Sequence, residues 1–337
     1  MPQMPVGPWV LVVGSHRSGT SAVTGALVAL GLNGVAPDDR MDDLESNPEH
    51  WESLSVALYN EDLLVRLGGT WDAPPDSPTE PLGANASTEY QDAARLMATA
   101  YPSPGPLVWK DPRTSLLLTH WRAMLPGSLA AVFVWRDPME VALSLHKRDG
   151  ISIEDGLALW DHYNRSAAAG LNGVDTFVLD YGSVVTDPTG SMVALADWLR
   201  NLGQFEGQAT LWDVGAAASS IDGGLRHHQG GATGNVGEGL PMEQLVLVNW
   251  LESIGGGHRP FAIQPPPSPS PWPEAVIRLR REPARLASEL LSVRREHELL
   301  DAELRGLQLH LANIQSSSSW RITKPLRSVL ARLQHLR

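Results

Sequence analysis

The stretch that decides the fold is WVLVVGSHRSGTSAVTGALVAL, residues 9–30. Its first five residues are an uninterrupted apolar run, which predicts a buried strand. Gly14 then opens a tight turn into a polar loop, and the apolar residues beyond the loop have the spacing of a helix, namely Val23, Leu27 and Leu30. A strand followed by a glycine-containing loop and a helix start directs several backbone N–H groups at one point. Together with the positive end of the helix dipole, these groups predict a pocket for an anion, usually a phosphate.

The loop nearly matches G-x-x-x-x-G-K-[ST], the phosphate-binding P-loop of nucleotide-binding proteins. Gly14 and Gly19 have the required spacing, but Thr20 and Ser21 follow, so the lysine that would contact the β- and γ-phosphates is absent. Arg17 supplies a cation inside the loop instead. We therefore expect the loop to hold a phosphate-like group, whereas an ordinary ATPase is disfavoured.

The composition of the chain excludes several classes of protein and of binding partner. The chain has 337 residues, is 42% hydrophobic, carries a formal charge of −12 and contains no cysteine. This length and composition allow one large core with an appendage. The negative charge argues against nucleic acid as a partner, and the lack of cysteine excludes disulfides and thiolate metal sites. We expect a cytoplasmic protein, because no apolar run has the length of a membrane span and no basic segment precedes an apolar one at the N-terminus.

Strand-like and helix-like segments alternate along the chain, which predicts an α/β fold. Strands are expected at residues 9–13, 107–109, 129–135 and 176–179. Helices are expected after the phosphate loop, from Trp51 to Leu67, at residues 86–100, 114–125 and 153–171, after Pro138, and from Pro188 to Leu202. Such alternation is typical of a three-layer, P-loop-like domain with a mainly parallel sheet and helices on both faces.

Three polar clusters follow strand ends, at residues 14–21, 110–113 and 136–148. Ligands of parallel sheets bind beyond the carboxyl ends of the strands, so we expect the three clusters to form one crevice. Ser144 and Arg148 are four residues apart on one helix face, and Arg136 ends the preceding strand. Two arginines and a hydroxyl suit a phosphate monoester. Asp111 and Asp137 precede prolines, and turn and cap roles explain them best.

These residues also carry a family resemblance. HRSGTS after a strand, the KDPR turn and RDPxxxxxSLxxR occur here in order. Together they resemble the sulfotransferases that use 3′-phosphoadenosine 5′-phosphosulfate (PAPS), most of all bacterial enzymes related to the Golgi protein-tyrosine and glycan sulfotransferases. The resemblance covers about residues 8 to 260.

The resemblance implies PAPS as cosubstrate and no metal. The 5′-phosphosulfate would lie on residues of the loop, namely Arg17, Ser18, Gly19, Thr20 and Ser21. The 3′-phosphate would lie on Arg136, Ser144 and Arg148, and Tyr181 is a weaker candidate for the cofactor side. Arg17 and Lys110 would neutralise charge as the sulfuryl group leaves.

The base that takes the acceptor proton is expected after the Asn47-Pro48 turn, where the family has an aromatic residue and a Glu. Glu52 is the first candidate, with Glu45 and His50 as alternatives. The family's commoner form has a Gly before the aromatic residue, which this chain lacks. Glu52 could instead only support the helix start electrostatically. Residues 219–239 are rich in glycine and are interpreted either as a lid over the cofactor or as a plain flexible loop.

The chain divides by composition into residues 1–262, a proline-rich linker at 263–273, a heptad-patterned helix at 274–315 and a basic tail at 316–337. The heptads predict a coiled coil, hence a homodimer or a partner helix, with a single helix packed on the catalytic domain as the alternative. The tail suits an interfacial helix on the inner face of an anionic membrane or a disordered basic segment. It also resembles tails of bacterial surface-glycan glycosyltransferases.

We therefore expect sulfuryl transfer from PAPS to a hydroxyl of a carbohydrate or glycolipid. Two other classes compete with this hypothesis. One is a P-loop kinase of small molecules, and the other is a non-catalytic scaffold in surface-glycan assembly.

Overall fold

The computed structural model describes residues 4–41, 51–76, 86–125, 128–207, 212–221 and 240–281, and the single positions 210, 286, 300, 304 and 307. The chain divides into two compact units, Met1–Glu282 and Pro283–Arg337. In the second unit, four heptad leucines are helical and exposed, namely Leu286, Leu300, Leu304 and Leu307. The rest of that unit, including the predicted basic tail, lies outside the described residues.

The first unit is built on a five-stranded sheet in the order β2-β1-β3-β4-β5. The strands are β1 (Trp9–Val13), β2 (Leu107–Lys110), β3 (Leu129–Trp135), β4 (Asp175–Asp180) and β5 (Gly256–His258). The first four are parallel and β5 is antiparallel to β4. Val12 pairs with Lys110 of β2 and with Val132 of β3, so these three strands end side by side.

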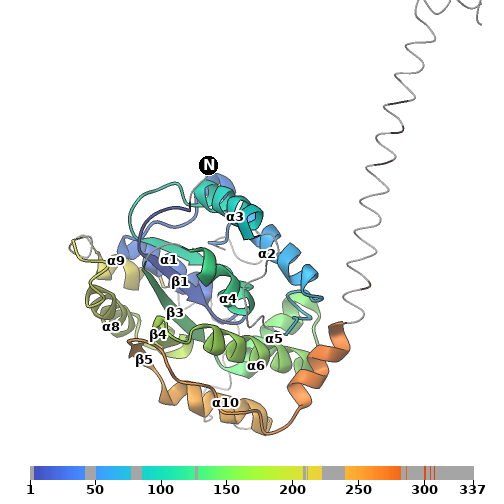
Figure 1. Cartoon of the computed structure of the whole chain (residues 1–337). Coiled ribbons are helices and arrows are strands. Elements are labelled where there is room, and N and C mark those ends of the chain that lie inside the picture. The colour runs from blue at the N-terminus through green and yellow to red at the C-terminus, as the bar shows by residue number, and fades with distance from the viewer. Residues whose placement is uncertain are drawn as a thin grey trace, which may run out of the picture. The chain divides into compact units, whose positions relative to one another are not determined.

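Helices cover both faces of the sheet (Figure 1). One face carries α1 (Thr20–Leu30), α8 (Pro188–Arg200) and α9 (Val214–Ser219). The other face carries α2 (Leu54–Arg66), α3 (Ala86–Ala100), α4 (Thr114–Met124), α5 (Pro138–Asp149), α6 (Ile153–Gly170) and α10 (Met242–Ser253). The short helix α7 (Tyr181–Thr186) follows β4 directly, and a 3-10 turn, η1, spans Pro37–Asp39. The predicted three-layer α/β fold with a mainly parallel sheet is thus confirmed.

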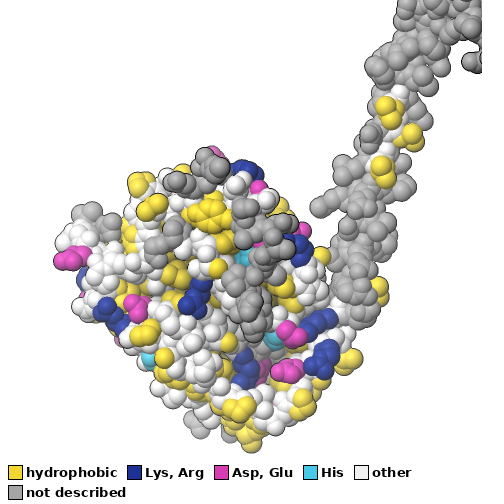
Figure 2. All heavy atoms as spheres, in the orientation of Figure 1, with side chains coloured by type: hydrophobic (Ala, Val, Ile, Leu, Met, Phe, Trp, Pro, Cys, Tyr) yellow, Lys and Arg dark blue, Asp and Glu magenta, His cyan; other side chains and the backbone are white. Residues whose placement is uncertain are grey.

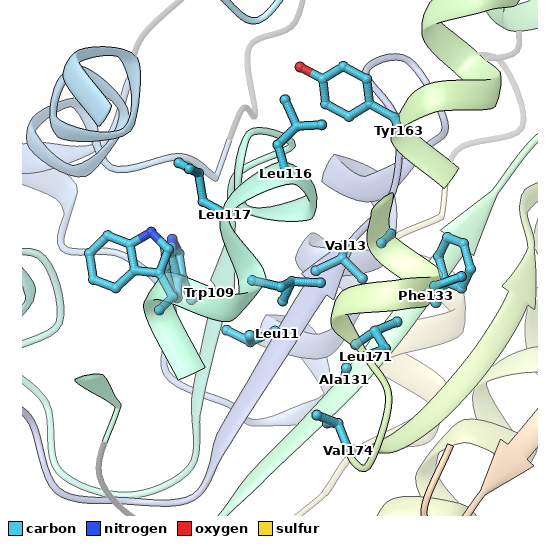
Figure 3. Close-up of a cluster of buried hydrophobic side chains, with 14 of the residues drawn as sticks. Leu11, Val13, Trp109, Leu116, Leu117, Ala131, Phe133, Tyr163, Leu171 and Val174 are labelled. Carbon is cyan, nitrogen blue, oxygen red and sulfur yellow. The ribbon is translucent and has the colours of Figure 1, made fainter. Parts of the chain in front are cut away.

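The central strands are apolar on both faces because both faces are buried. Leu11 and Val13 face the core that α4 and α6 cover, whereas Val10 and Val12 face the core under α1. Figure 3 shows the first of these cores, where Phe133 of β3 and Leu117 of α4 lie over the strands. This explains why β1 has no alternation of apolar and polar residues.

Aspartates at helix starts have the capping role expected of them. Asp137 accepts a hydrogen bond from the backbone N–H of Glu140 at 3.0 Å and caps α5. Asp111 accepts one from the N–H of Arg113 at 2.9 Å, within the turn that leads to α4. The interpretation of these two carboxylates as turn and cap residues is confirmed.

Several elements differ from the sequence prediction. The helix expected from Trp51 begins at Leu54, because Trp51 has a φ of 52° and Ser53 is the N-cap. The glycine-rich loop expected from Ser219 begins later, since Ser219 ends α9 and Ile221 is buried. β5, α7, α9 and α10 were not predicted, and β5 consists of two glycines and a histidine, which carry no strand pattern.

Residues 263–271 have no regular secondary structure, and a helix runs from 272 to 281. Ile263 and Trp272 pack against the core, and Ile277 is fully buried in it. The helix at 272–281 therefore includes the last two residues of the segment expected to be a linker, and it is part of the first unit.

Leu117 of α4 has an exposed fraction of 0%. We expect Leu117→Ala to lower the free energy of unfolding by about 2–5 kcal/mol, because removal of three side-chain carbons loses buried apolar surface and leaves a cavity in a close-packed core. Urea denaturation followed by circular dichroism measures the change. Leu58 of α2, which is 62% exposed, is the matched control, and Leu58→Ala should change stability by less than about 0.5 kcal/mol. Equal losses for the two variants would contradict this account of the core.

Candidate active site

The loop between β1 and α1 is compact because two glycines allow close contacts. Gly14 has a φ of 153°, and a Cβ there would lie 2.1 Å from the carbonyl oxygen of Val134. Gly19 has a φ of 87°, and a Cβ there would lie 2.1 Å from the ring of Tyr181. A side chain at position 14 would collide with the backbone of β3, and one at position 19 would collide with the Tyr181 ring. The two glycines that define the motif are therefore required by packing as well as by turn geometry.

Neighbouring elements hold the loop at both ends. The N–H of Gly14 donates to the Ser115 hydroxyl at 3.0 Å, and that hydroxyl donates to the Gly14 carbonyl oxygen at 3.0 Å. The hydroxyls of Ser15 and Ser18 lie 2.5 Å apart. Gly19 is the N-cap of α1, which has no side-chain cap and no acidic residue in its first turn among the described residues. The backbone N–H groups at the start of α1 are therefore suited to the anion that the sequence predicts.

A first cationic cluster forms beside the loop. Arg17 has a φ of 66°, and its Nε donates to the Ser144 hydroxyl at 2.8 Å. The guanidinium of Arg136 donates to the Arg17 carbonyl oxygen at 3.4 Å and lies 5.3 Å above the Tyr181 ring. Burial, together with the charges of Arg148 and Arg136, lowers the pKa of Arg17. The structure therefore brings Arg17, Arg136, Ser144 and Tyr181 into one cluster, with Arg148 close enough to repel Arg17.

Carboxylates balance the cations of this cluster. Arg136 Nε donates to Glu140 at 2.7 Å, and both side chains are buried. Arg148 pairs with Asp149 at 2.8 Å, and its guanidinium lies 5.7 Å above the ring of Trp71. The Trp160 indole N–H donates to the Arg136 carbonyl oxygen at 2.8 Å. The backbone and the side chain of Arg136 are therefore both held, which gives the cluster a defined shape without a ligand.

A second cluster lies at the end of β2. Lys110 Nζ donates to the Ser21 hydroxyl at 2.9 Å and forms an ion pair with Glu52. Lys110 and Glu52 are 3% and 8% exposed, so the pair is buried. Ser21 is the second residue of α1, so Lys110 links this cluster directly to the phosphate loop. A buried, paired charge of this kind is expensive to maintain, which indicates a requirement other than stability.

Arg113 completes the second cluster. Its guanidinium donates to Glu61 at 2.6 Å and to Asp111 at 3.1 Å, and it lies 3.5 Å from Glu52. Burial alone would lower the pKa of Arg113, but the three carboxylates outweigh it and raise that pKa. Burial also raises the pKa of Glu61, although Arg113 opposes this. The carboxylate of Glu52 thus lies between two cations, Lys110 and Arg113.

The other base candidates cannot be placed. Glu45 and His50 lie outside the described residues, as do Asn47 and Pro48. The same holds for residues 222–239 of the glycine-rich loop. Among the candidates, Glu52 is the one whose surroundings the structure describes.

Sequence reasoning missed an aromatic layer beside the loop. The imidazole of His16 packs on Trp71 at 4.7 Å and edge-on against Tyr163 at 5.3 Å. Burial, with the nearby charges of Arg113 and Arg148, lowers the pKa of His16 well below its usual range, so the ring is neutral at neutral pH. Trp71 lies in a segment that showed only turn residues, and Tyr163 lies in one that showed only helix periodicity. The only available signal was His16 itself, in the middle of the phosphate loop.

Across the described ranges, no three His, Asp, Glu or Cys side chains are placed to hold a metal ion together. Among the helices the structure describes, none is long and apolar enough to cross a bilayer.

Comparisons with known proteins give several structural neighbours, two of which are sulfotransferase domains. No protein-family model matches the sequence, and no curated protein matches it. The sulfotransferase domain from the curacin biosynthetic pathway aligns with 66% of this chain and 90% of its own, at 16% identity and a TM-score of 0.37. The sulfotransferase domain of the olefin synthase from Synechococcus PCC 7002 aligns with 74% of this chain and 95% of its own, at 17% identity and a TM-score of 0.38.

His162 of α6 gives a pH prediction. Its Nε2 lies 3.2 Å from the carbonyl oxygen of Pro75, and burial, followed by the charge of Arg281, lowers its pKa from 6.5 to about 4. Between these values the unfolded chain binds the proton and the folded one does not, so stability falls as pH drops from 6.5 towards 4. We expect His162 to contribute about 2–3 kcal/mol to the loss of stability between pH 7 and pH 4.5.

Urea denaturation at the two pH values, with His162→Gln as the variant, measures this contribution. Glutamine can still donate to Pro75 but does not titrate. The variant should therefore lose about 2–3 kcal/mol less than the wild type on acidification. An identical loss in both proteins would show that His162 does not resist protonation in the folded state.

Proposed function

We propose that this protein transfers a sulfuryl group from PAPS to a hydroxyl group. The observation that carries the proposal is the arrangement of two cationic clusters beside one phosphate loop that lacks the P-loop lysine. One cluster contains Arg17, Arg136 and Ser144, and the other contains Lys110 and Arg113. A ligand with anionic groups at two separate points satisfies both clusters, and PAPS has a 5′-phosphosulfate and a 3′-phosphate.

The loop and α1 are suited to the 5′-phosphosulfate. The uncapped start of α1 provides backbone N–H groups, and Ser18, Thr20 and Ser21 provide hydroxyls nearby. Lys110 reaches the same place from β2, since its Nζ already donates to Ser21. Lys110 thereby supplies, from a neighbouring strand, the positive charge that a P-loop lysine supplies from the loop itself.

The first cluster is suited to the 3′-phosphate. Arg136 and Ser144 are buried and oriented by Glu140 and Arg17, and Arg148 adds a third positive charge. Phosphate oxygens there would relieve the mutual repulsion of the three guanidinium groups. The Tyr181 ring under Arg136 would flank the adenosine. These are the roles that the motif resemblance implies for the same residues.

The reaction would need a base for the proton of the acceptor hydroxyl, and it would need cations that stabilise the charge on the departing adenosine 3′,5′-bisphosphate. The acceptor oxygen bonds to sulfur, the bond between sulfur and the bridging oxygen breaks, and adenosine 3′,5′-bisphosphate leaves with the electron pair. The hydroxyl proton passes to Glu52. Arg17 and Lys110 neutralise the charge that develops on the bridging oxygen. Glu52 has two cationic partners, Lys110 and Arg113, and its carboxylate form is the form that can accept a proton.

We further propose a carbohydrate or glycolipid acceptor, supported by the resemblance of residues 316–337 to tails of surface-glycan glycosyltransferases. The heptad leucines described at 286, 300, 304 and 307 are exposed in the single chain, which supports pairing with a second copy. The basic tail would then bring the acceptor's membrane close to the enzyme.

Calorimetric titration tests the donor assignment. We expect adenosine 3′,5′-bisphosphate to bind more tightly than ADP or ATP, because only the bisphosphate has a 3′-phosphate. Arg136→Ala and Ser144→Ala should each weaken this binding about tenfold or more, the loss of one charge-assisted contact. The serine variant guards against misfolding, because removing Arg136 leaves Glu140 buried without this partner.

Arg95→Ala is the control, since Arg95 is exposed on α3 and pairs only with Asp92 among the described residues. A preference for ATP would overturn the sulfotransferase proposal in favour of the kinase. Binding of the bisphosphate without sulfation of any acceptor would favour the scaffold.

Glu52→Gln tests the base. With the hydroxyl acceptor that is sulfated best in a screen of sugars and glycolipids, we expect kcat to fall about 10²–10⁴-fold while bisphosphate affinity changes little. Glu61→Gln is the matched control, because Glu61 also pairs with Arg113 but has no contact with Lys110 among the described residues. Its kcat should fall less than about tenfold. Similar losses in the two variants would assign Glu52 to the ion-pair network alone.

A further inference from the structure

The segment 70–76, which we call the Trp71 loop, contacts the candidate site at two points: the phosphate loop and the guanidinium of Arg148. The ring of Trp71 packs on His16 of the phosphate loop at 4.7 Å. The same ring lies 5.7 Å from the guanidinium of Arg148, at the end of α5. Trp71 is therefore placed to fix the position of a charge that would hold the 3′-phosphate.

Arg148 needs a group that holds its guanidinium close to Arg17. It is close enough to Arg17 to lower the pKa of that residue, so the two guanidinium groups repel each other. Asp149 pairs with Arg148 from one side, and the face of the Trp71 ring attracts the cation from another. Without the ring, Arg148 would be free to turn away from Arg17 towards solvent.

The Trp71 loop has little regular structure of its own and is held from outside. Thr70 and Ala73 close a turn, with a backbone hydrogen bond of 3.0 Å. From α6, the Tyr163 hydroxyl donates to the Trp71 carbonyl oxygen at 2.7 Å, and His162 contacts the Pro75 carbonyl oxygen. These contacts fix the side of the loop that faces α6.

The opposite side is held by two arginines of the helix at 272–281, about 200 residues later in the chain. Arg280 donates to the Asp72 carbonyl oxygen at 2.8 Å and pairs with the carboxylates of Asp72 at 3.1 Å and Asp155 at 2.6 Å. Arg281 donates to the Pro74 carbonyl oxygen at 2.6 Å and pairs with Asp76 at 2.9 Å. In Figure 2, basic and acidic side chains alternate where this helix meets the rest of the unit.

The two arginines restrain the backbone as well as side chains. A single exposed ion pair contributes little, because solvent screens it and long side chains lose entropy. Here each guanidinium also binds a carbonyl oxygen, and Arg280 joins the loop to Asp155 at the start of α6. The helix that carries them is itself anchored, since Ile277 is fully buried.

We propose that Arg280 and Arg281 are positioning residues for the candidate site. They hold the Trp71 loop where the Trp71 ring supports Arg148, and they thereby raise affinity for a ligand with a 3′-phosphate. The proposal rests on the proposed function and extends it, because it makes the base of the C-terminal appendage part of the binding machinery.

The test compares two nucleotides that differ only in the 3′-phosphate. We expect Arg280→Ala, Arg281→Ala and Trp71→Ala to weaken binding of adenosine 3′,5′-bisphosphate about 3- to 10-fold, as loss of a cation–π support implies. Binding of adenosine 5′-monophosphate should change less than about twofold, because Arg148 is not expected to contact it. Adding Arg280→Ala to Trp71→Ala should cause no further loss, since both act through the same ring.

Arg278→Ala is the control on the same helix. Arg278 is exposed, and among the described residues no hydrogen bond or ion pair joins it to the Trp71 loop. Its charge reaches Asp76 only through solvent-screened attraction, so both affinities should change less than about twofold. Hydrogen exchange of the free protein gives a second readout. Amides of residues 70–76 should exchange faster in the Arg280→Ala/Arg281→Ala variant, while those of β1 stay protected.

Three results would overturn the proposal. The first is unchanged bisphosphate binding in the arginine variants, and the second is an equal loss for both nucleotides, which would indicate general destabilisation. The third is an additive loss when Arg280→Ala is combined with Trp71→Ala. Absence of bisphosphate binding by the wild type would instead overturn the proposed function, and the positioning role with it.

Discussion

The parallel pairing of β1 with β2 on one side and with β3 on the other brings three strand ends to one edge of the sheet. In this register, Val12 lies beside Lys110, the last residue of β2, and beside Val132, three residues before the end of β3, so the chain leaves all three strands at the same edge of the sheet. The phosphate loop, the KDPR turn and the start of α5 follow at once. Parallel strands require crossover helices, and those helices in turn place their N-termini at this edge. The candidate site is a direct consequence of that pairing.

Charge is concentrated at this edge in a chain that is acidic as a whole. With a formal charge of −12, the chain still places five cationic side chains around the loop. Each has a carboxylate or hydroxyl partner: Glu140 for Arg136, Asp149 for Arg148, Glu52 for Lys110, Glu61 for Arg113, and Ser144 for Arg17. Two of these pairs, Arg136–Glu140 and Lys110–Glu52, are buried, and buried ion pairs recover little of their desolvation cost, so they add little to the stability of the fold. An anionic ligand would bind to cations that their protein partners already orient, and it would share these cations with those partners.

The site was predictable from the sequence to the extent that its residues lie in short motifs. Gly14, Arg17 and Gly19 stand within six positions of one another, and Ser144 follows Arg136 by eight positions across a recognisable helix start. Trp71 could not be predicted in the same way. It stands in a segment of turn residues, and its role comes from contacts with His16 and Arg148, which are remote in sequence. Arg280 and Arg281 were assigned to the heptad-patterned helix, and nothing in that pattern indicated their contacts with Asp72 and Pro74.

The sequence by itself determined the α/β class, the position of the phosphate loop and the four parallel strands. Strands buried on both faces and helix starts produce patterns within a few consecutive residues, and such patterns can be recognised without knowing the tertiary contacts. Only the tertiary structure decided that Glu52 lies between Lys110 and Arg113, that β5 completes the sheet edge, and that residues 272–281 belong to the first unit. Each of these depends on contacts between segments far apart in the chain. Such contacts depend on the shape of the packed core and on where its layers end, which no local pattern encodes.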